Sequence, residues 1–227
     1  MAEIDRWKQY WDKQTTPLHS YNNPFWYKLF ADEINLLLRA SEYIGGATLE
    51  TACGNGALFP YLEINKTNYV GVDLSQTLID IFKQNYPDLT LICGDASAYR
   101  SDKIFSLVLS NALVQYLNKQ ALHNYILNSM SLLDEKGVIL MANIPWKHNR
   151  LNFLSGELAS GENIKDARHS WIKIVKSLIW LAMNGHDPMG YYYNPRDFFK
   201  YKHLNADVFV YGSLFHPSRF SVVLKKK

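Results

Sequence analysis

The sequence has few of the features that mark secreted, metal-binding or membrane proteins. Only two of its 227 residues are cysteines, Cys53 and Cys93, and their spacing fits neither a disulfide framework nor a cysteine metal site. We interpret them as reduced thiols of a cytoplasmic protein and predict no metal. No apolar run approaches the roughly 20 residues of a membrane-spanning helix, and the amino terminus lacks the apolar core of a signal peptide. We therefore expect no stable membrane insertion.

A strong excess of charge is also lacking. The formal net charge is +3, and the terminal Lys225-Lys226-Lys227 accounts for all of it. Such an excess is typical of a solvated tail. No basic patch with interleaved aromatic residues is evident, so we expect no nucleic-acid partner.

The periodicity of apolar residues predicts two helices followed by alternating strands and helices. The first two helices cover residues 3–14 and about 25–40, and they form a cap, residues 1–44. Predicted strands follow at 47–51, 68–73, 89–93, 104–110 and 138–142, with helices at 56–63, 75–86 and 118–133. Buried strands that alternate with helices indicate a parallel sheet covered on both faces.

The alternation stops after residue 145. Residues 145–204 form a predicted acceptor-side insertion or lid, and residues 206–225 hold a closing antiparallel strand pair. The insertion contains a strongly apolar helix, residues 170–183, for which three interpretations stay open: a buried lid, a contact with a second subunit (a homodimer), or a membrane-surface helix. We predict one domain, residues 1–227, of α/β class. Its fold is Rossmann-like and doubly wound, with a mostly parallel seven-stranded sheet whose last strand is antiparallel.

The turn after the first strand is rich in small residues. Leu49-Glu50-Thr51-Ala52-Cys53-Gly54-Asn55-Gly56 runs from an apolar strand through an acid into two glycines. Glycines let the backbone bend and let a ligand approach closely. We expect the first turn of a following helix to offer unpaired N–H groups to polar ligand atoms.

Two further strands end in acids, Asp73 and Asp95. Ligands of open parallel sheets bind at the carboxyl ends of the strands. A carboxylate suits the vicinal hydroxyls of a ribose at Asp73 and an adenine amino group at Asp95, and the adjoining Leu74 and Ala96 could sandwich the adenine. Both acids could instead be simple helix caps. NAD is less favoured, because Phe59 replaces the third glycine of Gly-x-Gly-x-x-Gly.

Residues 47–143 resemble a class I S-adenosylmethionine-dependent methyltransferase of the small-molecule type. The motifs that carry the likeness are Glu50–Gly56, Tyr69–Ser75, Cys93–Ala96, Phe105–Leu113 and Leu132–Val138, and Ala52 departs from the family's first glycine. The resemblance implies S-adenosylmethionine as cofactor. The residues predicted to bind it are Glu50, Ala52, Cys53, Gly54, Gly56, Asp73, Leu74, Asp95, Ala96, Ser110 and Asn111.

The acceptor is predicted to be a small molecule. The fourth motif reads Ser110-Asn111-Ala112-Leu113 and lacks the Asn/Asp-Pro-Pro-aromatic sequence frequent in enzymes that methylate exocyclic nitrogens. Candidate bases are His148, His169, His186 and Asp187. Candidate acceptor contacts are Trp11, Tyr21, Trp146, Tyr191 and Tyr192, whose rings suit stacking but equally suit a core.

The favoured function is in-line transfer of a methyl group to a hydroxyl oxygen of a sugar or secondary metabolite. Three alternatives remain: a non-catalytic binding or scaffold protein with the same fold, an N-methyltransferase of a small amine, and a nucleotide-dependent oxidoreductase.

Overall fold

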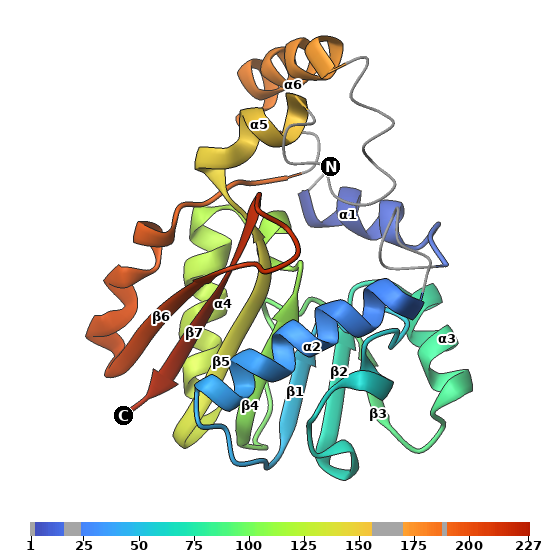
Figure 1. Ribbon diagram of the computed structural model, residues 1–227. Helices are drawn as coiled ribbons and strands as arrows, with labels where there is room; N and C mark the ends of the chain where they lie inside the picture. Colours follow the sequence, from blue (N-terminus) through green and yellow to red (C-terminus); the bar gives the residue numbers. More distant parts are fainter. Residues whose placement is uncertain (1–2, 16–23, 156–169, 188–189) are drawn as a thin grey trace.

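The computed structural model describes residues 3–15, 24–155, 170–187 and 190–227. Seven strands form one sheet in the order β3-β2-β1-β4-β5-β7-β6 (Figure 1). The strands are β1 (Thr48–Thr51), β2 (Tyr69–Asp73), β3 (Thr90–Cys93), β4 (Phe105–Asn111), β5 (Leu133–Pro145), β6 (Ala206–Gly212) and β7 (Arg219–Lys226). The first five strands pair in parallel, and β7 lies antiparallel between β5 and β6. The predicted doubly wound sheet with an antiparallel last strand is confirmed.

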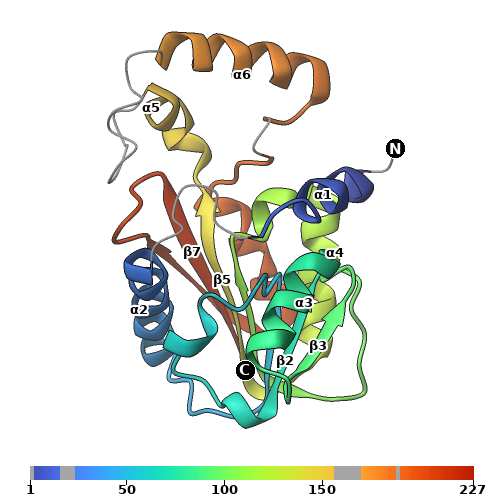
Figure 2. The same ribbon diagram turned by 90° about the vertical axis from the view of Figure 1, so that its right-hand side faces the viewer.

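Helices cover both faces of the sheet (Figure 2). The α-helices are α1 (Glu3–Trp11), α2 (Pro24–Ala40), α3 (Gln76–Asn85), α4 (Lys119–Ser131), α5 (Arg150–Ser155) and α6 (Ser170–Asn184). The 3₁₀ helices are η1 (Phe59–Tyr61), η2 (Lys66–Asn68), η3 (Val114–Tyr116), η4 (Lys147–Asn149), η6 (Pro195–Asp197) and η7 (Phe199–Leu204). Strand β4 shows why two layers form: Leu107 and Leu109 pack with the α2 side, whereas Val108 packs with α4. Successive side chains of a strand point to opposite faces.

Side-chain caps fix the starts of two helices. Ser75 Oγ accepts a hydrogen bond from Leu78 N at the start of α3, and Asn118 accepts from Gln120 N and Ala121 N at the start of α4. Such caps satisfy N–H groups that have no partner within the helix. The sequence predicted both starts correctly.

The helix predicted over residues 56–63 is absent. The chain instead makes turns and the single 3₁₀ turn η1. Pro60 lies inside η1 and cannot donate a backbone hydrogen bond, and Gly56 has a left-handed φ of 75°. The buried Phe59 ring packs edge-on against Tyr69 at 4.8 Å between ring centroids. The expectation that a helix start faces the ligand here was therefore wrong.

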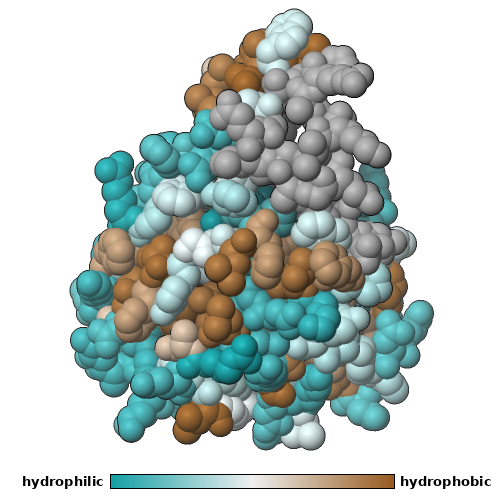
Figure 3. Space-filling model, in the orientation of Figure 1, coloured by the Kyte–Doolittle hydropathy of each residue, from teal (hydrophilic) through white to brown (hydrophobic). Residues whose placement is uncertain are grey.

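Within the insertion after β5, Tyr193, Phe198 and Tyr201 pack in the core. The part formed by α5 and α6 stands away from the sheet, at the carboxyl ends of the strands (Figures 1 and 2). It is tied together by Arg150, whose Nη2 lies 2.8 Å from Asp187 Oδ2, and by Ser177, which bonds to both. Helix α6 exposes many apolar side chains, and brown atoms gather around it in Figure 3. The exposed residues are Trp171, Val175, Leu178, Ile179, Trp180 and Met183. Within the described residues, no helix is long and apolar enough to cross a membrane.

Candidate active site

The carboxyl ends of β1, β2 and β3 meet at Asp73. Gly54 N, in the turn after β1, donates to Asp73 Oδ2 at 2.8 Å, and Ser75 N donates to Asp73 Oδ1 at 2.9 Å. Gly94 N, after β3, donates to the backbone oxygen of Asp73 at 2.8 Å. Three motifs that are distant in sequence are thus brought to one edge of the sheet.

Asp73 keeps acceptor capacity for a ligand. Burial raises its pKa above the ordinary value, although the N–H donors of Ser75 and Gly54 act in the opposite direction. A carboxylate offers about four acceptor sites. The backbone N–H groups of Gly54, Ser75 and Leu74 bond to this one, which leaves part of its acceptor capacity for a ligand.

Several other predicted cofactor residues have buried side chains. Glu50 is 3% exposed, and Tyr69 Oη donates to its Oε2 at 2.6 Å. Burial raises the pKa of Glu50 to about 7. Cys53 and Ser110 are also buried. The turn can therefore meet a ligand through its backbone, with these side chains beneath it.

Strained backbone marks the ends of three strands. Ala52 after β1 and Ala112 after β4 each have a φ of 58°, and Asn143 in β5 has a φ of 62°. Residues other than glycine adopt such angles at a cost of order 1–3 kcal/mol and tend to do so at functional sites. Ala52 occupies the position where the family has glycine, so the structure gives a reason for that glycine.

Gly56 has a packing role. A β-carbon on Gly56 would lie 2.3 Å from the ring of Phe82 on α3, and Phe82 is fully buried. Glycine at this position therefore lets the turn pack against α3. The prediction that Gly56 also contacts the cofactor stays a prediction.

The end of β3 supplies the second predicted acid. Asp95 is half-buried, and its Oδ1 accepts from Ser97 N at 2.8 Å and from Ser97 Oγ at 2.7 Å. These bonds are those of a turn-capping aspartate. No helix begins here, so Asp95 is not the helix cap that the alternative interpretation expected. Leu74 is half-buried and Ala96 is buried in the core.

Helix α1 lies across the edge formed by these strand ends. Asp12 Oδ1 accepts from Gln76 N at 3.1 Å, and Trp11 O accepts from Ser75 Oγ at 3.2 Å. The ring of Trp11 contacts Tyr116 edge-on at 5.9 Å between centroids. Sequence reasoning missed Asp12 and Tyr116, because nothing in the pattern of α1 indicates what lies beneath it.

The histidine–aspartate candidates lie in the insertion. The carboxylate of Asp187 is 2% exposed and is held by Arg150 and Ser177, an arrangement that supports the insertion. His186 Nδ1 lies 2.7 Å from Asp187 O, and its Nε2 lies 3.4 Å from Arg6 Nη1. His148 is exposed on η4.

The aromatic candidates are divided between core and insertion. Trp146 packs against the core near Phe220, and Tyr191 lies 5.4 Å from the His186 ring. Tyr192 lies near Arg150, and burial raises its pKa to about 12. Tyr21 and His169 lie outside the described residues.

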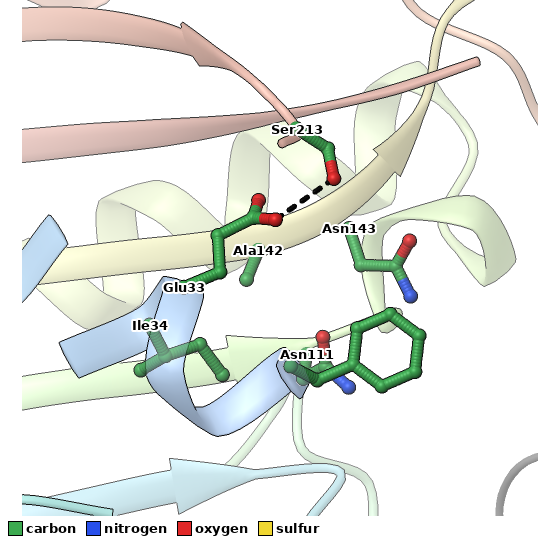
Figure 4. A pocket seen from close by; sticks show the side chains of 7 residues that line it. Glu33, Ile34, Asn111, Ala142, Asn143 and Ser213 are labelled. Atoms are coloured by element: carbon green, nitrogen blue, oxygen red, sulfur yellow. Dashed lines mark hydrogen bonds between the residues drawn. The ribbon is translucent and has the colours of Figure 1, made fainter. Parts of the chain in front are cut away.

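A pocket opens at the ends of β4 and β5, between α2 and the turn that joins β6 to β7 (Figure 4). It is open to solvent and has a cavity volume of about 10 Å³, which is room for about one water molecule. Its lining residues are Phe30, Glu33, Ile34, Asn111, Ala142, Asn143 and Ser213. Sequence reasoning missed Glu33. The available signal was an acid on the apolar face of α2, three residues after Phe30 and four before Leu37.

Comparisons with known proteins agree with this geometry. Residues 48–137 match the family model described as "Methyltransferase domain". The chain is 32% identical over 100 residues to the malonyl-[acyl-carrier protein] O-methyltransferase of Priestia megaterium. That match spans 42% of this chain and only 36% of the relative's length.

Two solved structures share the fold over most of their length. An S-adenosylmethionine-dependent methyltransferase from Clostridium acetobutylicum is 17% identical with a TM-score of 0.60, covering 88% of this chain and 92% of that one. The sugar N-methyltransferase KedS8 from Streptoalloteichus sp. is 12% identical with a TM-score of 0.63, covering 92% and 94%. Identities this low show a shared fold only. Residues 48–137 thus match a methyltransferase domain, and the chain as a whole shares its fold with S-adenosylmethionine-dependent methyltransferases.

Proposed function

We propose that this protein binds S-adenosylmethionine at the ends of β1, β2 and β3 and transfers its methyl group to a small-molecule acceptor. The observation that carries the proposal is the convergence of Gly54, Ser75 and Gly94 on Asp73. The convergence places a buried carboxylate, with part of its acceptor capacity unused, beside a turn that contains glycine and the left-handed Ala52.

In this proposal, the chain holds the cofactor mainly through backbone and buried groups. Asp73 accepts hydrogen bonds from the ribose, the Ala52–Gly54 backbone faces the amino-acid end, and Asp95 with Leu74 and Ala96 lies at the adenine. When bound, S-adenosylmethionine supplies a methyl group that is already strongly electrophilic. The protein's main task is then alignment of the acceptor, which contributes up to about 7–11 kcal/mol in well-oriented systems.

The acceptor atom is proposed to be a hydroxyl oxygen. The relative from Priestia megaterium is by name an O-methyltransferase, which supports oxygen. His186, Asp187 and His148 remain candidate bases, and Trp11, Trp146, Tyr191 and Tyr192 remain candidate acceptor contacts. Of these residues, Trp11 contacts the proposed cofactor site directly, because its backbone oxygen accepts a hydrogen bond from Ser75 Oγ.

Isothermal titration calorimetry with S-adenosylhomocysteine tests the cofactor assignment. We expect saturable binding that S-adenosylmethionine displaces and NAD does not. Displacement by NAD would favour an oxidoreductase, and absence of binding would favour a scaffold protein. Incubation with radiolabelled S-adenosylmethionine and separate hydroxyl and amine acceptors then tests which atom is methylated.

A further inference from the structure

The pocket at the ends of β4 and β5 contains a buried acid. Glu33 on α2 is 8% exposed, Ser213 Oγ donates to its Oε2 at 2.9 Å, and Leu214 N donates to the same oxygen at 3.2 Å. Figure 4 shows the Glu33 carboxylate at the pocket wall, bonded to Ser213. Ser213 and Leu214 donate to one oxygen, and the backbone N–H of Phe215 also bonds to the carboxylate. A carboxylate has about four acceptor sites, so Glu33 can still accept a proton.

The same pocket contains a polar atom whose partner is missing. Asn111 Oδ1 is buried and has no hydrogen-bond partner among the described residues. Burying such an atom without a partner costs about 1–3 kcal/mol. A hydrogen-bond donor on a ligand would remove this cost, so Asn111 points to a ligand with a polar hydrogen.

The pocket lies at the same edge of the sheet as the proposed cofactor site. Strand β4 adjoins β1, and β5 adjoins β4. The carboxyl ends of β4 and β5 therefore lie along the same edge of the sheet as Asp73, on the side of β1 that is farther from β3. Neighbouring strands are about 4.8 Å apart. A molecule in the pocket is therefore one to two strand spacings from the turn after β1, on the side opposite the proposed adenine end.

The surroundings of Glu33 favour a role as proton acceptor over a role in an ion pair. Arg219, at the start of β7, directs Nη1 to Gln115 Oε1 at 2.8 Å and to Asn143 O at 3.2 Å. Burial raises the pKa of Glu33 above its ordinary value. A carboxylate whose pKa is raised toward neutrality is a better proton acceptor.

We propose that this pocket takes the hydroxyl end of the acceptor and that Glu33 is the general base that removes its proton. The acceptor oxygen forms a bond to the methyl carbon as the sulfur–carbon bond breaks. The electron pair of that bond stays on sulfur, giving S-adenosylhomocysteine, and the hydroxyl proton passes to Glu33 and then to water. Asn111 positions the acceptor. This inference rests on the proposed function.

The test compares two acceptor probes of similar shape at pH 8. Phenol must lose its proton during transfer, whereas 4-nitrophenol is already largely ionised. We expect Glu33→Gln to slow methylation of phenol by at least about 100-fold, the lower end of what a general base contributes. Methylation of 4-nitrophenol and the affinity for S-adenosylhomocysteine should change less than about threefold in that variant.

Two further variants separate catalysis from folding. Glu33→Gln keeps an oxygen for Ser213, and Glu33→Asp keeps the carboxylate, so we expect Asp to restore part of the phenol activity. Glu63→Gln, an exposed glutamate that pairs with Arg39, is the matched control and should leave both rates unchanged. Equal losses with both probes, or no loss with phenol, would overturn the assignment of Glu33. Failure of the unmodified protein to bind S-adenosylhomocysteine would instead contradict the proposed function.

Discussion

The hydroxyl of Tyr69 donates a 2.6 Å hydrogen bond to Glu50 Oε2 beneath the turn after β1. Burial nevertheless raises the pKa of Glu50 to about 7, with Asp73 adding to the rise. In the unfolded chain, the pKa of Glu50 returns to its ordinary value near 4.5. Between these values, the folded state holds a proton that the unfolded state has lost, so stability falls as pH rises.

We therefore expect the free energy of unfolding to fall by roughly 3 kcal/mol from Glu50 between pH 4.5 and 7 and to level off above. Glu50→Gln mimics the protonated form and should abolish this component. Denaturant unfolding at several pH values measures it, with the exposed Asp88→Asn as control. Parallel curves for the unmodified protein and Glu50→Gln would contradict the assignment.

Asp73 is predicted to govern cofactor affinity. Asp73→Ala removes the proposed ribose acceptors and the bond to Gly54 N, so we expect the dissociation constant for S-adenosylhomocysteine to rise at least about tenfold, equivalent to about 1.4 kcal/mol. Calorimetry measures it. Asp88→Asn on the surface serves again as control, and an unchanged affinity in Asp73→Ala would count against the site.

Gly56 is predicted to tolerate no side chain. Gly56→Ala places a methyl group against the buried Phe82 ring at a left-handed φ of 75°. Overpacking costs about 1–3 kcal/mol and the backbone about 1–2 kcal/mol, so we expect a loss of roughly 3 kcal/mol in unfolding free energy. Gly212→Ala is the control, because nothing lies within 4 Å of its β-carbon position. Similar stabilities of the two variants would refute the packing role.

Replacement of Ala52 by glycine is predicted to stabilise the folded protein. Its φ of 58° costs alanine about 1–2 kcal/mol, and glycine's greater freedom in the unfolded chain offsets about 0.5–1 kcal/mol. Ala52→Gly should therefore raise the free energy of unfolding by about 0.5–1 kcal/mol. Ala121→Gly inside α4 should lower it by about 1 kcal/mol. Should both variants lose stability alike, the left-handed conformation of Ala52 would be wrong.

Local patterning was enough to predict the parallel strands and the acids at their ends. Strand and helix periods are properties of neighbouring residues, and the ends of parallel strands share one edge whatever follows them. Glu50–Gly56, Asp73 and Asp95 were therefore identified correctly as residues of one edge. The short helix after Gly56 was predicted wrongly, because Pro60 and the packing of Phe59 against Tyr69 outweighed the apolar pattern.

The sequence by itself thus determined the order of the strands along the chain, most of the helices and the motifs at the strand ends. Only the tertiary structure decided which polar side chains are buried and what they bond to. Glu33 meets Ser213 across 180 positions of sequence, and Asp187 meets Arg150 across 37. Burial and hydrogen bonding depend on segments that pack together only in the folded chain, and no local period carries that information.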